Sequence, residues 1–341
     1  MAFKVSQALA QSMNVKEEEY LKYLDIVCVG TISDIVPLIS ENRVITKLGI
    51  KLLKQTRNTG LKAIINSSGY SQINSTTISF GVAPRINACG RMGKAEQALK
   101  LLLSKDIYEV NKLTQELNNY NRERQEIEKE IFESVLNKIE QNNLDKNRTI
   151  VVGGEGWHHG VIGIVSSKIT EKYFKPSILL SFEEDGTGKG SGRSIPGFDL
   201  HEALMKCENC LEKFGGHSMA VGLTLKKDKF EQFYEEFEKV AKENKTENIV
   251  PIINVDAKIE LNEIDKTVVE DLKQLEPFGE ANKMPVFALK NIRIDSIRAL
   301  SEGKHLKLTL RDNNQIINAI GFNIGELANE YKIGDKVDLA G

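Results

Sequence analysis

A glycine-rich stretch, Gly188–Leu225, constrains the fold of this chain more than any other segment. It reads GKGSGRSIPGFDLHEALMKCENCLEKFGGHSMAVGLTL and holds six of the chain's 26 glycines within Gly188–Gly216. Glycine lacks a Cβ, so its backbone N–H groups can approach an anion and positive φ angles become accessible. Two glycine loops, Gly190–Gly197 and Gly215–His217, are expected to flank a helix that begins after its N-cap candidate Asp199.

Polar side chains beside these glycines suggest a pocket for a phosphorylated ligand. Arg193 has a planar fork of donors suited to phosphate, and Ser191 and Ser194 have hydroxyl donors. If the two loops converge in space, these groups and His217 line one pocket. Ordinary turns between strands and a helix are the alternative, which explains the glycines but explains Arg193 and His217 less well.

The same stretch resembles a known superfamily. FGGHSMAVGLTL is similar to the GGHxxAxG signature of the DHHA1 domain, which follows a metal-binding DHH domain in the DHH phosphoesterases. SGRSIPGFDL resembles the SGRS segment of the RecJ family, bacterial single-strand-specific 5′→3′ DNA exonucleases. The resemblance implies that His217 is catalytic, as a hydrogen-bond donor to the scissile phosphate. It also implies substrate-binding roles for Ser191, Arg193, Ser194, Gly215 and Gly216.

Similar segments occur along nearly the whole chain, and together they imply a mixed α/β architecture in four parts. Residues 1–103 are expected to be the carboxyl-terminal part of a DHH α/β domain, and residues 104–146 a connecting helix. Residues 147–245 are expected to form a DHHA1 α/β domain, and residues 250–341 an incomplete OB-fold β-barrel. A length of 341 residues is consistent with more than one domain.

The first part carries a candidate metal ligand. Val5–Met13 and Leu48–Gln55 have helical patterns, whereas Asp25–Thr31 (DIVCVGT) reads as a buried strand of a parallel sheet. Asp34 would follow that strand, at the sheet edge where ligand sites gather; a helix or turn cap before Pro37 is the alternative from the residues alone. VGTISDIVPLISENR resembles the RecJ segment whose aspartate coordinates the catalytic metal, which implies that Asp34 is a catalytic metal ligand.

Residues 80–93 (FGVAPRINACGRMG) read as a loop punctuated by glycine and proline. Arg85 and Arg91 flank Asn87 there, a composition suited to phosphate contact, although solvated loop arginines are an equal alternative. The segment resembles the APRINAxGRM motif of the RecJ family, which lies beside the active site. The resemblance implies that Arg85, Asn87 and Arg91 bind substrate and that both arginines face the bound strand.

A periodic run after Ser104 predicts one helix of about 33 residues, roughly 50 Å long. Apolar residues recur at threes and fours from Ile107 to Ile139, and Arg124 occupies one seam position. A coiled-coil oligomerisation helix is the alternative. The single apolar stripe and its polar interruptions favour a spacer between two domains.

A second α/β region follows, with strands expected at Arg148–Gly153 and Ser177–Phe182 around a helix at Val161–Tyr173. His158 and His159 precede that helix, where they could bind metal or position a phosphate. GWHxGVxGI is a RecJ-type segment in which only the first histidine matches. His158 is therefore a substrate-binding candidate, and His159 is expected to face solvent.

Cys207 and Cys210 have CxxC spacing, and His201 and His217 could complete four zinc ligands on paper. A helix expected at Leu200–Leu211 would instead place both thiols one turn apart, where they can be core residues. We therefore expect neither zinc nor a disulfide.

The last part suggests a small β-barrel. Lys304 and Lys307 lie at the start of a strand with an exposed basic face, as in an OB-fold that holds single-stranded nucleic acid. EPFGEANKMPVFAL and GKHLKLTL resemble the corresponding RecJ segments. The expected strands are Ile252–Ile259, Val286–Ile297, His305–Leu310 and Ile316–Phe322.

Composition limits how the chain can meet nucleic acid. The net charge is −2, so binding must come from a local basic groove. No apolar run approaches the length of a membrane span, and we expect a cytoplasmic location. No Asp-His-His triplet occurs, so we expect an internal fragment that lacks most metal ligands and is inactive alone.

By resemblance, the full enzyme is a single-stranded-DNA-specific 5′→3′ exonuclease that uses two Mn²⁺ or Mg²⁺ ions in DNA repair and recombination. We expect a monomer, with single-stranded DNA as its ligand and a single-strand-binding protein or helicase as possible protein partners. One alternative is a DHH–DHHA1 phosphodiesterase of short oligonucleotides or cyclic dinucleotides, which would lack a barrel. The other is a module that binds single-stranded nucleic acid without cutting it.

Overall fold

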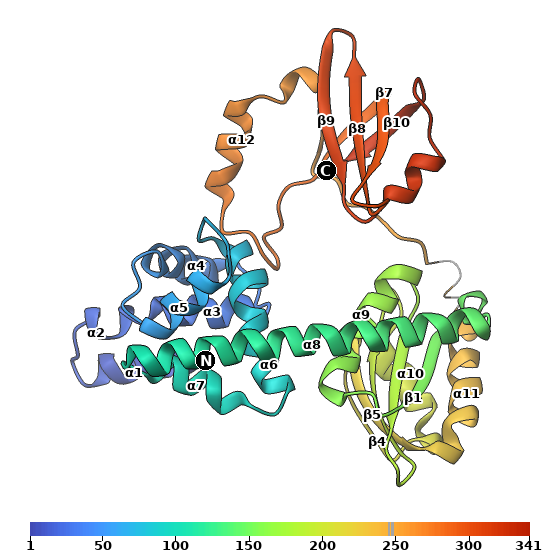
Figure 1. Ribbon diagram of the computed structural model, residues 1–341, viewed down its shortest axis with the longest axis horizontal. Helices are drawn as coiled ribbons and strands as arrows, with labels where there is room; N and C mark the ends of the chain where they lie inside the picture. The colour runs from blue at the N-terminus through green and yellow to red at the C-terminus, as the bar shows by residue number, and fades with distance from the viewer. Residues whose placement is uncertain (245, 247–248) are drawn as a thin grey trace. The chain divides into compact units, whose positions relative to one another are not determined.

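The computed structural model describes residues 1–244, 246 and 249–341 (Figure 1). The chain divides into two units. The first comprises Met1–Gln55, Ile73–Thr76 and Ile252–Gly341, and the second comprises Thr56–Gln72 and Thr77–Pro251. Within the described residues, no helix combines the length and apolarity that a membrane crossing needs.

The amino-terminal part of the first unit is helical throughout, and the strand expected at Asp25–Thr31 was wrong. Those residues lie in helix α3, and Asp34 is its C-cap. The buried residues of α3, among them Cys28 and Ile32, recur at helical spacing, which a short apolar run does not separate from a buried strand. Gly49 lets α4 approach α3, because a Cβ there would lie 2.4 Å from Cβ of Cys28. The helices are α1 (Ala2–Ser12), α2 (Glu18–Leu21), α3 (Leu24–Ser33) and α4 (Ser40–Leu53).

The carboxyl-terminal part of the first unit is an open β-sheet. Its strands run in the order β10-β7-β8-β9, and β6 pairs with β7. Alternate residues of β8 are buried, including Leu306 and Leu310, so one face of the sheet covers an apolar core. Three of the four expected strands are confirmed, whereas only a two-residue β6 forms within Ile252–Ile259. The elements are β6 (Ala257–Lys258), α12 (Lys266–Leu272), β7 (Phe287–Leu300), β8 (His305–Asp312), β9 (Gln315–Gly321) and β10 (Lys336–Ala340).

The second unit begins with helices, and one of them forms at residues 80–93, where a loop was expected. Residues 80–93 contain the end of a π-helical turn and helix α6, so the loop prediction was wrong. Pro84 sits in the first turn of α6, where the missing N–H costs no hydrogen bond, and Gly93, with φ +69°, follows the helix end. The elements are α5 (Thr59–Ser67), the π-helical turn (Thr77–Val82), α6 (Ala83–Arg91) and α7 (Ala95–Leu103).

Helix α8 (Ile107–Gln141) runs the length of the second unit (Figure 1). Its 35 residues confirm the predicted long helix and correspond to roughly 52 Å. Asp106 is the N-cap, since its side chain accepts a hydrogen bond from the N–H of Tyr108. The amino-terminal half packs against α5, α6 and α7, and the carboxyl-terminal half packs against β1 and α9.

A five-stranded mixed sheet follows, in the order β1-β2-β3-β5-β4. Strands β1 and β2 are parallel, and the other pairs are antiparallel. Helices α8 and α9 cover one face over β1, β2 and β3, and α10 and α11 cover the other face. The elements are β1 (Ile150–Glu155), α9 (His159–Tyr173), β2 (Ser177–Phe182), β3 (Thr187–Arg193), α10 (Leu200–Lys206), β4 (Lys213–His217), β5 (Ala220–Lys226) and α11 (Phe230–Glu243).

The two predicted glycine loops are largely strand. Ser191 and Arg193 lie in β3, and Gly215–His217 ends β4. The predicted helix start is confirmed, because the Asp199 side chain accepts from the N–H of Glu202. Helix α10 ends at Lys206, however, and a 3₁₀ turn replaces the expected last turn.

Candidate nucleic-acid interface

One face of the sheet in the second unit carries most of the predicted site residues. Residues paired directly across an antiparallel ladder share a face. Arg193 pairs with Ala220, which pairs with His217, so these three form one row across β3, β5 and β4. Ser191, Gly222 and Gly215 form the next row, and Lys189, Thr224 and Lys213 the third. We call these three rows the open sheet face.

Two of the three residues in the middle row of this face are glycines, with open space above them. A Cβ built on Gly215 would meet no atom within 4 Å, and one on Gly222 would meet only the Gly190 carbonyl oxygen at 4.0 Å. The residues between the rows point the other way: Val221 and Leu223 are buried in the core under α10 and α11. The open sheet face is therefore a shallow trough, with Ser191 and Arg193 on one side and His217 on the other.

The side chains of Arg193 and Ser191 converge on helix α9. Arg193 Nη1 lies 3.1 Å from Ser191 Oγ and 2.8 Å from the Gly192 carbonyl oxygen. A Cβ on Gly163 of α9 would lie 2.9 Å from Ser191 Oγ and 3.2 Å from Arg193 Nη2, so glycine is required for this approach. Within the described residues, no carboxylate pairs with Arg193, which leaves most of its donors for an anion.

Arg91 joins this group from the end of α6. Its Nη1 donates to the Gly160 carbonyl oxygen at 2.8 Å, one turn before Gly163 on α9. Burial lowers the pKa of Arg193, and so does the positive charge of Arg91. Both side chains reach the start of α9, Arg91 at Gly160 and Arg193 at Gly163, and neighbouring positive charges favour an anion beside them. We call Arg91, Ser191 and Arg193, with Gly160 and Gly163, the arginine cradle.

Three other predicted residues are not part of this cradle, although Asn87 lies only one turn before Arg91 on α6. Arg85 donates to Asn118 Oδ1 at 2.6 Å and to the carbonyl oxygens of Gly81 and Ser67, so its guanidinium links α5, α6 and α8 internally. Ser194 is buried on the opposite side of β3, where its hydroxyl donates to the Phe198 carbonyl oxygen at 2.6 Å. Asn87 is exposed on α6.

Gly216 has a structural requirement of its own. Its φ is +140°, and a Cβ there would lie 2.3 Å from the Ala220 carbonyl oxygen. No other residue fits without moving the β4–β5 hairpin that presents His217.

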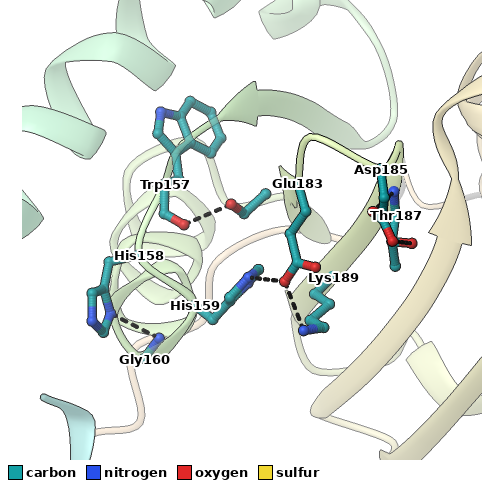
Figure 2. A network of polar contacts seen from close by, with 9 residues as sticks. Trp157, His158, His159, Gly160, Glu183, Asp185, Thr187 and Lys189 are labelled. Carbon is teal, nitrogen blue, oxygen red and sulfur yellow. Dashed lines mark hydrogen bonds and ion pairs between the residues drawn. The ribbon is translucent and has the colours of Figure 1, made fainter. Parts of the chain in front are cut away.

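The histidine pair sits at the start of α9, as Figure 2 shows. His158 is the N-cap, and its Nδ1 accepts from the Gly160 N–H at 3.1 Å. His159 is exposed, as predicted, and its Nε2 lies 3.1 Å from Glu183 Oε1. Glu183 also meets Lys189 at 2.7 Å; Lys189 and then His159 lower the pKa of that carboxyl group. His158 therefore holds the turn that places Gly160 against Arg91.

A cavity of about 980 Å³ opens at the carboxyl ends of β1 and β2, beside both histidines. Its charged lining is mixed, with Glu155 paired to Lys227 at 2.6 Å and Glu183 paired to Lys189. Glu184 adds a third carboxylate to this lining, where Lys227 is the one lysine among the described residues, so the cavity has an acidic excess and lacks the excess of donors that distinguishes the arginine cradle.

Asp34 lies in the first unit, exposed at the end of α3. Nowhere in the described part of the chain do three or more histidine, cysteine, aspartate or glutamate side chains gather closely enough to hold a metal ion. Asp34 offers one carboxylate, whereas a divalent cation in a protein needs several oxygen ligands. The described residues therefore do not by themselves form a divalent-cation site.

The four cysteines are free and buried. Burial is the main cause that raises the pKa of Cys28 and Cys207 to about 12 and that of Cys89 and Cys210 to about 11. Cys210 Sγ donates to Oε2 of Glu236 at 3.3 Å, which keeps the thiol protonated. The CxxC pair thus belongs to the core.

Because the thiolate is the reactive form, native protein should resist alkylation at pH 8. We expect iodoacetamide to modify none of the four cysteines within an hour in native buffer and all four in urea, measured by intact mass. Rapid modification of Cys207 and Cys210 in native buffer would contradict their assignment to the core.

Several contributors to this surface were not among the predicted site residues. Lys189 and Lys213 flank the trough, and Gly163 and Gly222 keep it open. Alternation along β3 and β5 was the available signal, since every second residue from Lys189 to Arg193 is polar and every second residue from Val221 to Leu225 is apolar.

Two family models match the chain. The DHHA1 domain matches residues 146–243, which carry the sheet of the second unit, and the RecJ OB domain matches residues 255–341, the open sheet of the first unit.

Relatives described as single-stranded-DNA-specific exonuclease RecJ match almost the whole chain. The protein from Bacillus subtilis is 36% identical over all of this chain and 43% of its own length. The protein from Escherichia coli is 30% identical over 94% of this chain and 58% of its own length. The chain thus spans about half the length of the curated relatives it matches.

Solved structures agree with the fold. RecJ from Thermus thermophilus in complex with Mg²⁺ is 30% identical, with a TM-score of 0.83 over 98% of this chain and 50% of its own. The same protein in complex with Mn²⁺ gives a TM-score of 0.85 over 98% of this chain and 48% of its own. An exonuclease RecJ bound to manganese gives 0.63 over 73% of this chain and 62% of its own.

Proposed function

Because this chain belongs to the RecJ family, we propose that it forms the strand-gripping half of a single-stranded-DNA-specific exonuclease that degrades DNA from the 5′ end. The observation that carries this proposal is the arginine cradle, where two guanidiniums and a hydroxyl meet at the edge of a bare trough. Arginine forks bind phosphate oxygens in pairs, with stronger hydrogen bonds than neutral donors give.

The trough suits a single strand better than a duplex or a small ligand. It is shallow and open, and its glycine row admits a sugar–phosphate backbone that side chains would exclude. Lys213 lies in the third row, farther from the cradle, where it can contact the next phosphate, and Lys189 in the same row can do so if it leaves Glu183. A protein with a net charge of −2 needs such a local basic surface to bind DNA.

The cradle lies at the end of this trough, so we propose that it holds the terminal 5′ phosphate and thereby sets the direction of degradation. Arg193 and Ser191 would contact that phosphate directly, and Arg91 would approach it from α6. His158 would act as a positioning residue, because it caps the turn that carries Gly160.

The remaining roles extend the same proposal. His217, exposed across the trough from Arg193, would donate a hydrogen bond to the phosphate at the reacting centre. Asp34 would contribute one carboxylate to a cation site that needs further ligands. Arg85 would hold α6 in place from inside the unit instead of touching the strand.

We also propose that the full protein works in DNA repair and recombination, as a monomer in the cytoplasm, with a single-strand-binding protein or a helicase as a partner. The open sheet matched by the RecJ OB domain would hold the strand downstream, through Lys304 and Lys307 among others.

A nuclease assay tests the proposal against its nearest competitor. We expect this chain to bind single-stranded DNA but to release no nucleotides in Mn²⁺ or Mg²⁺. A version extended at its amino terminus with the DHH segment of the Bacillus subtilis relative should degrade 5′-phosphorylated strands. Tight binding without cleavage by either version would favour a module that binds and does not cut. Cleavage restricted to dinucleotides or cyclic dinucleotides would favour the small-substrate phosphodiesterase.

A further inference from the structure

The loop between α3 and α4 is fastened by a turn from the other end of the first unit. That turn, residues 275–282, precedes β7 and lies within the part matched by the RecJ OB domain. The Leu38 N–H in the loop donates to the Glu280 carbonyl oxygen at 2.7 Å. Nη2 of Arg43 on α4 donates to the Leu275 carbonyl oxygen at 2.6 Å. Both contacts join residues more than 200 positions apart, and we call residues 275–282 the clamp turn.

The clamp turn packs tightly against Leu38, which is only 2% exposed. A Cβ built on Gly279 would lie 2.6 Å from Cδ1 of Leu38, so glycine permits this approach and a larger residue would displace Leu38. The Asn282 side chain closes the turn, because its Nδ2 donates to the carbonyl oxygens of Leu275 at 3.0 Å and Pro277 at 2.8 Å. The shape of the clamp turn therefore fixes where Leu38 can lie.

The backbone is strained at Ile35, the residue that follows Asp34. Its φ is +54°, in the left-handed region that a β-branched residue avoids. Ile35 is 70% exposed, so burial of its own side chain does not offset the strain. Such a conformation persists only where the surrounding structure holds it. The Val36 N–H bonds back to the Thr31 carbonyl oxygen at 3.1 Å, and Leu38 is the buried anchor that follows.

We propose that the clamp turn is a positioning segment for Asp34. By holding Leu38, it keeps Ile35 in the left-handed region and so fixes the backbone that carries the Asp34 carboxylate. The inference rests on the proposed function, which gives that carboxylate a part in the reaction. A carboxylate on a freely moving loop is seldom in the geometry that a reaction needs. The part of the chain matched by the RecJ OB domain thus shapes the surroundings of Asp34 as well as holding the strand.

Hydrogen exchange of the whole chain with Gly279→Ala tests the clamp turn. The new methyl group would displace Leu38, and the φ of Gly279 is one that alanine accepts. Amide exchange in residues 34–40 should accelerate about tenfold, measured by mass spectrometry, because a strained backbone opens locally once its anchor is lost. Gly30→Ala is the matched control on α3: its Cβ would meet no atom within 4 Å outside its own helix, so exchange should not accelerate.

Ile35→Asn tests whether the clamp turn resists this strain. Asparagine adopts the left-handed region more readily than isoleucine. Combined with Gly279→Ala, it should restore most of the lost protection, and a double variant that exchanges as fast as Gly279→Ala alone would overturn the inference. Asn282→Ala removes the two hydrogen bonds that close the turn. It should accelerate the same residues, and it replaces Gly279→Ala if that variant does not fold.

Turnover of the version extended with the DHH segment connects exchange to the reaction. Gly279→Ala should lower kcat about tenfold and change KM for single-stranded DNA less than about twofold, since the clamp turn does not belong to the trough. Unchanged exchange in residues 34–40, or accelerated exchange with unchanged kcat, would overturn the inference. An extended wild-type protein that does not cleave DNA would instead refute the proposed function, and the exchange of residues 34–40 would still decide whether the clamp turn holds the loop.

Discussion

Arg193→Ala should weaken binding of 5′-phosphorylated single-stranded DNA by about tenfold to a hundredfold, while binding of the 5′-hydroxyl strand changes much less. The substitution removes a charge-assisted contact to phosphate, which contributes about 1.5–3 kcal/mol. The fold should survive, because within the described residues the guanidinium donates to Ser191 and Gly192 on its own strand and to no other element. Anisotropy titrations with both strands measure the difference.

Two further variants sharpen this result. Arg193→Lys keeps the charge but loses the planar fork, so it should recover only part of the lost affinity. Arg122→Ala removes an exposed arginine of α8 that bonds to Asn119, and it should bind both strands as wild type does. If Arg193→Ala lowers the affinity for both strands equally, Arg193 does not bind the terminal 5′ phosphate.

Gly215→Gln should abolish most single-stranded DNA binding without unfolding the protein. The new side chain would start in open space and extend along the trough between Ser191 and His217. Obstruction of a close contact costs about 1–3 kcal/mol, which corresponds to roughly a fivefold to hundredfold loss of affinity. Gly215 is a strand residue, and replacing glycine in a strand stabilises it slightly.

A graded series separates obstruction from damage. Gly215→Ala should weaken binding less than Gly215→Gln, and urea unfolding should give both variants at least the wild-type free energy of unfolding. If Gly215→Gln binds DNA as tightly as wild type, the strand does not cross the middle row of the open sheet face.

Sequence patterns predicted helices and strands well where the apolar residues followed a single helical or strand periodicity. The apolar stripe from Ile107 to Ile139 predicted α8, and alternation predicted β8. The strand predicted at Asp25–Thr31 was wrong, because a short and nearly all apolar run can be buried either as a helix or as a strand. The loop predicted at residues 80–93 was wrong. Pro84 and Gly90 suggested a loop, but proline is tolerated in the first turn of a helix.

The candidate site was predictable residue by residue but not as a surface. Arg193, Ser191 and His217 were named from their neighbours and from a family resemblance. That they share a face depends on the β3–β5–β4 register, which no local pattern encodes. The hydrogen bond from Arg85 to Asn118 and the ion pair between Glu128 and Lys168 depend on how the helices pack. A local sequence pattern does not predict that packing either.

The most direct measurement of the central claim is an amide chemical-shift map of the ¹⁵N-labelled chain with a 5′-phosphorylated dithymidylate. Binding of its terminal phosphate in the arginine cradle predicts the largest shifts at Gly163, Ser191, Arg193 and Gly215, and smaller shifts with the 5′-hydroxyl ligand. Shifts confined to residues 255–341, or identical for the two ligands, would contradict a phosphate site on the open sheet face.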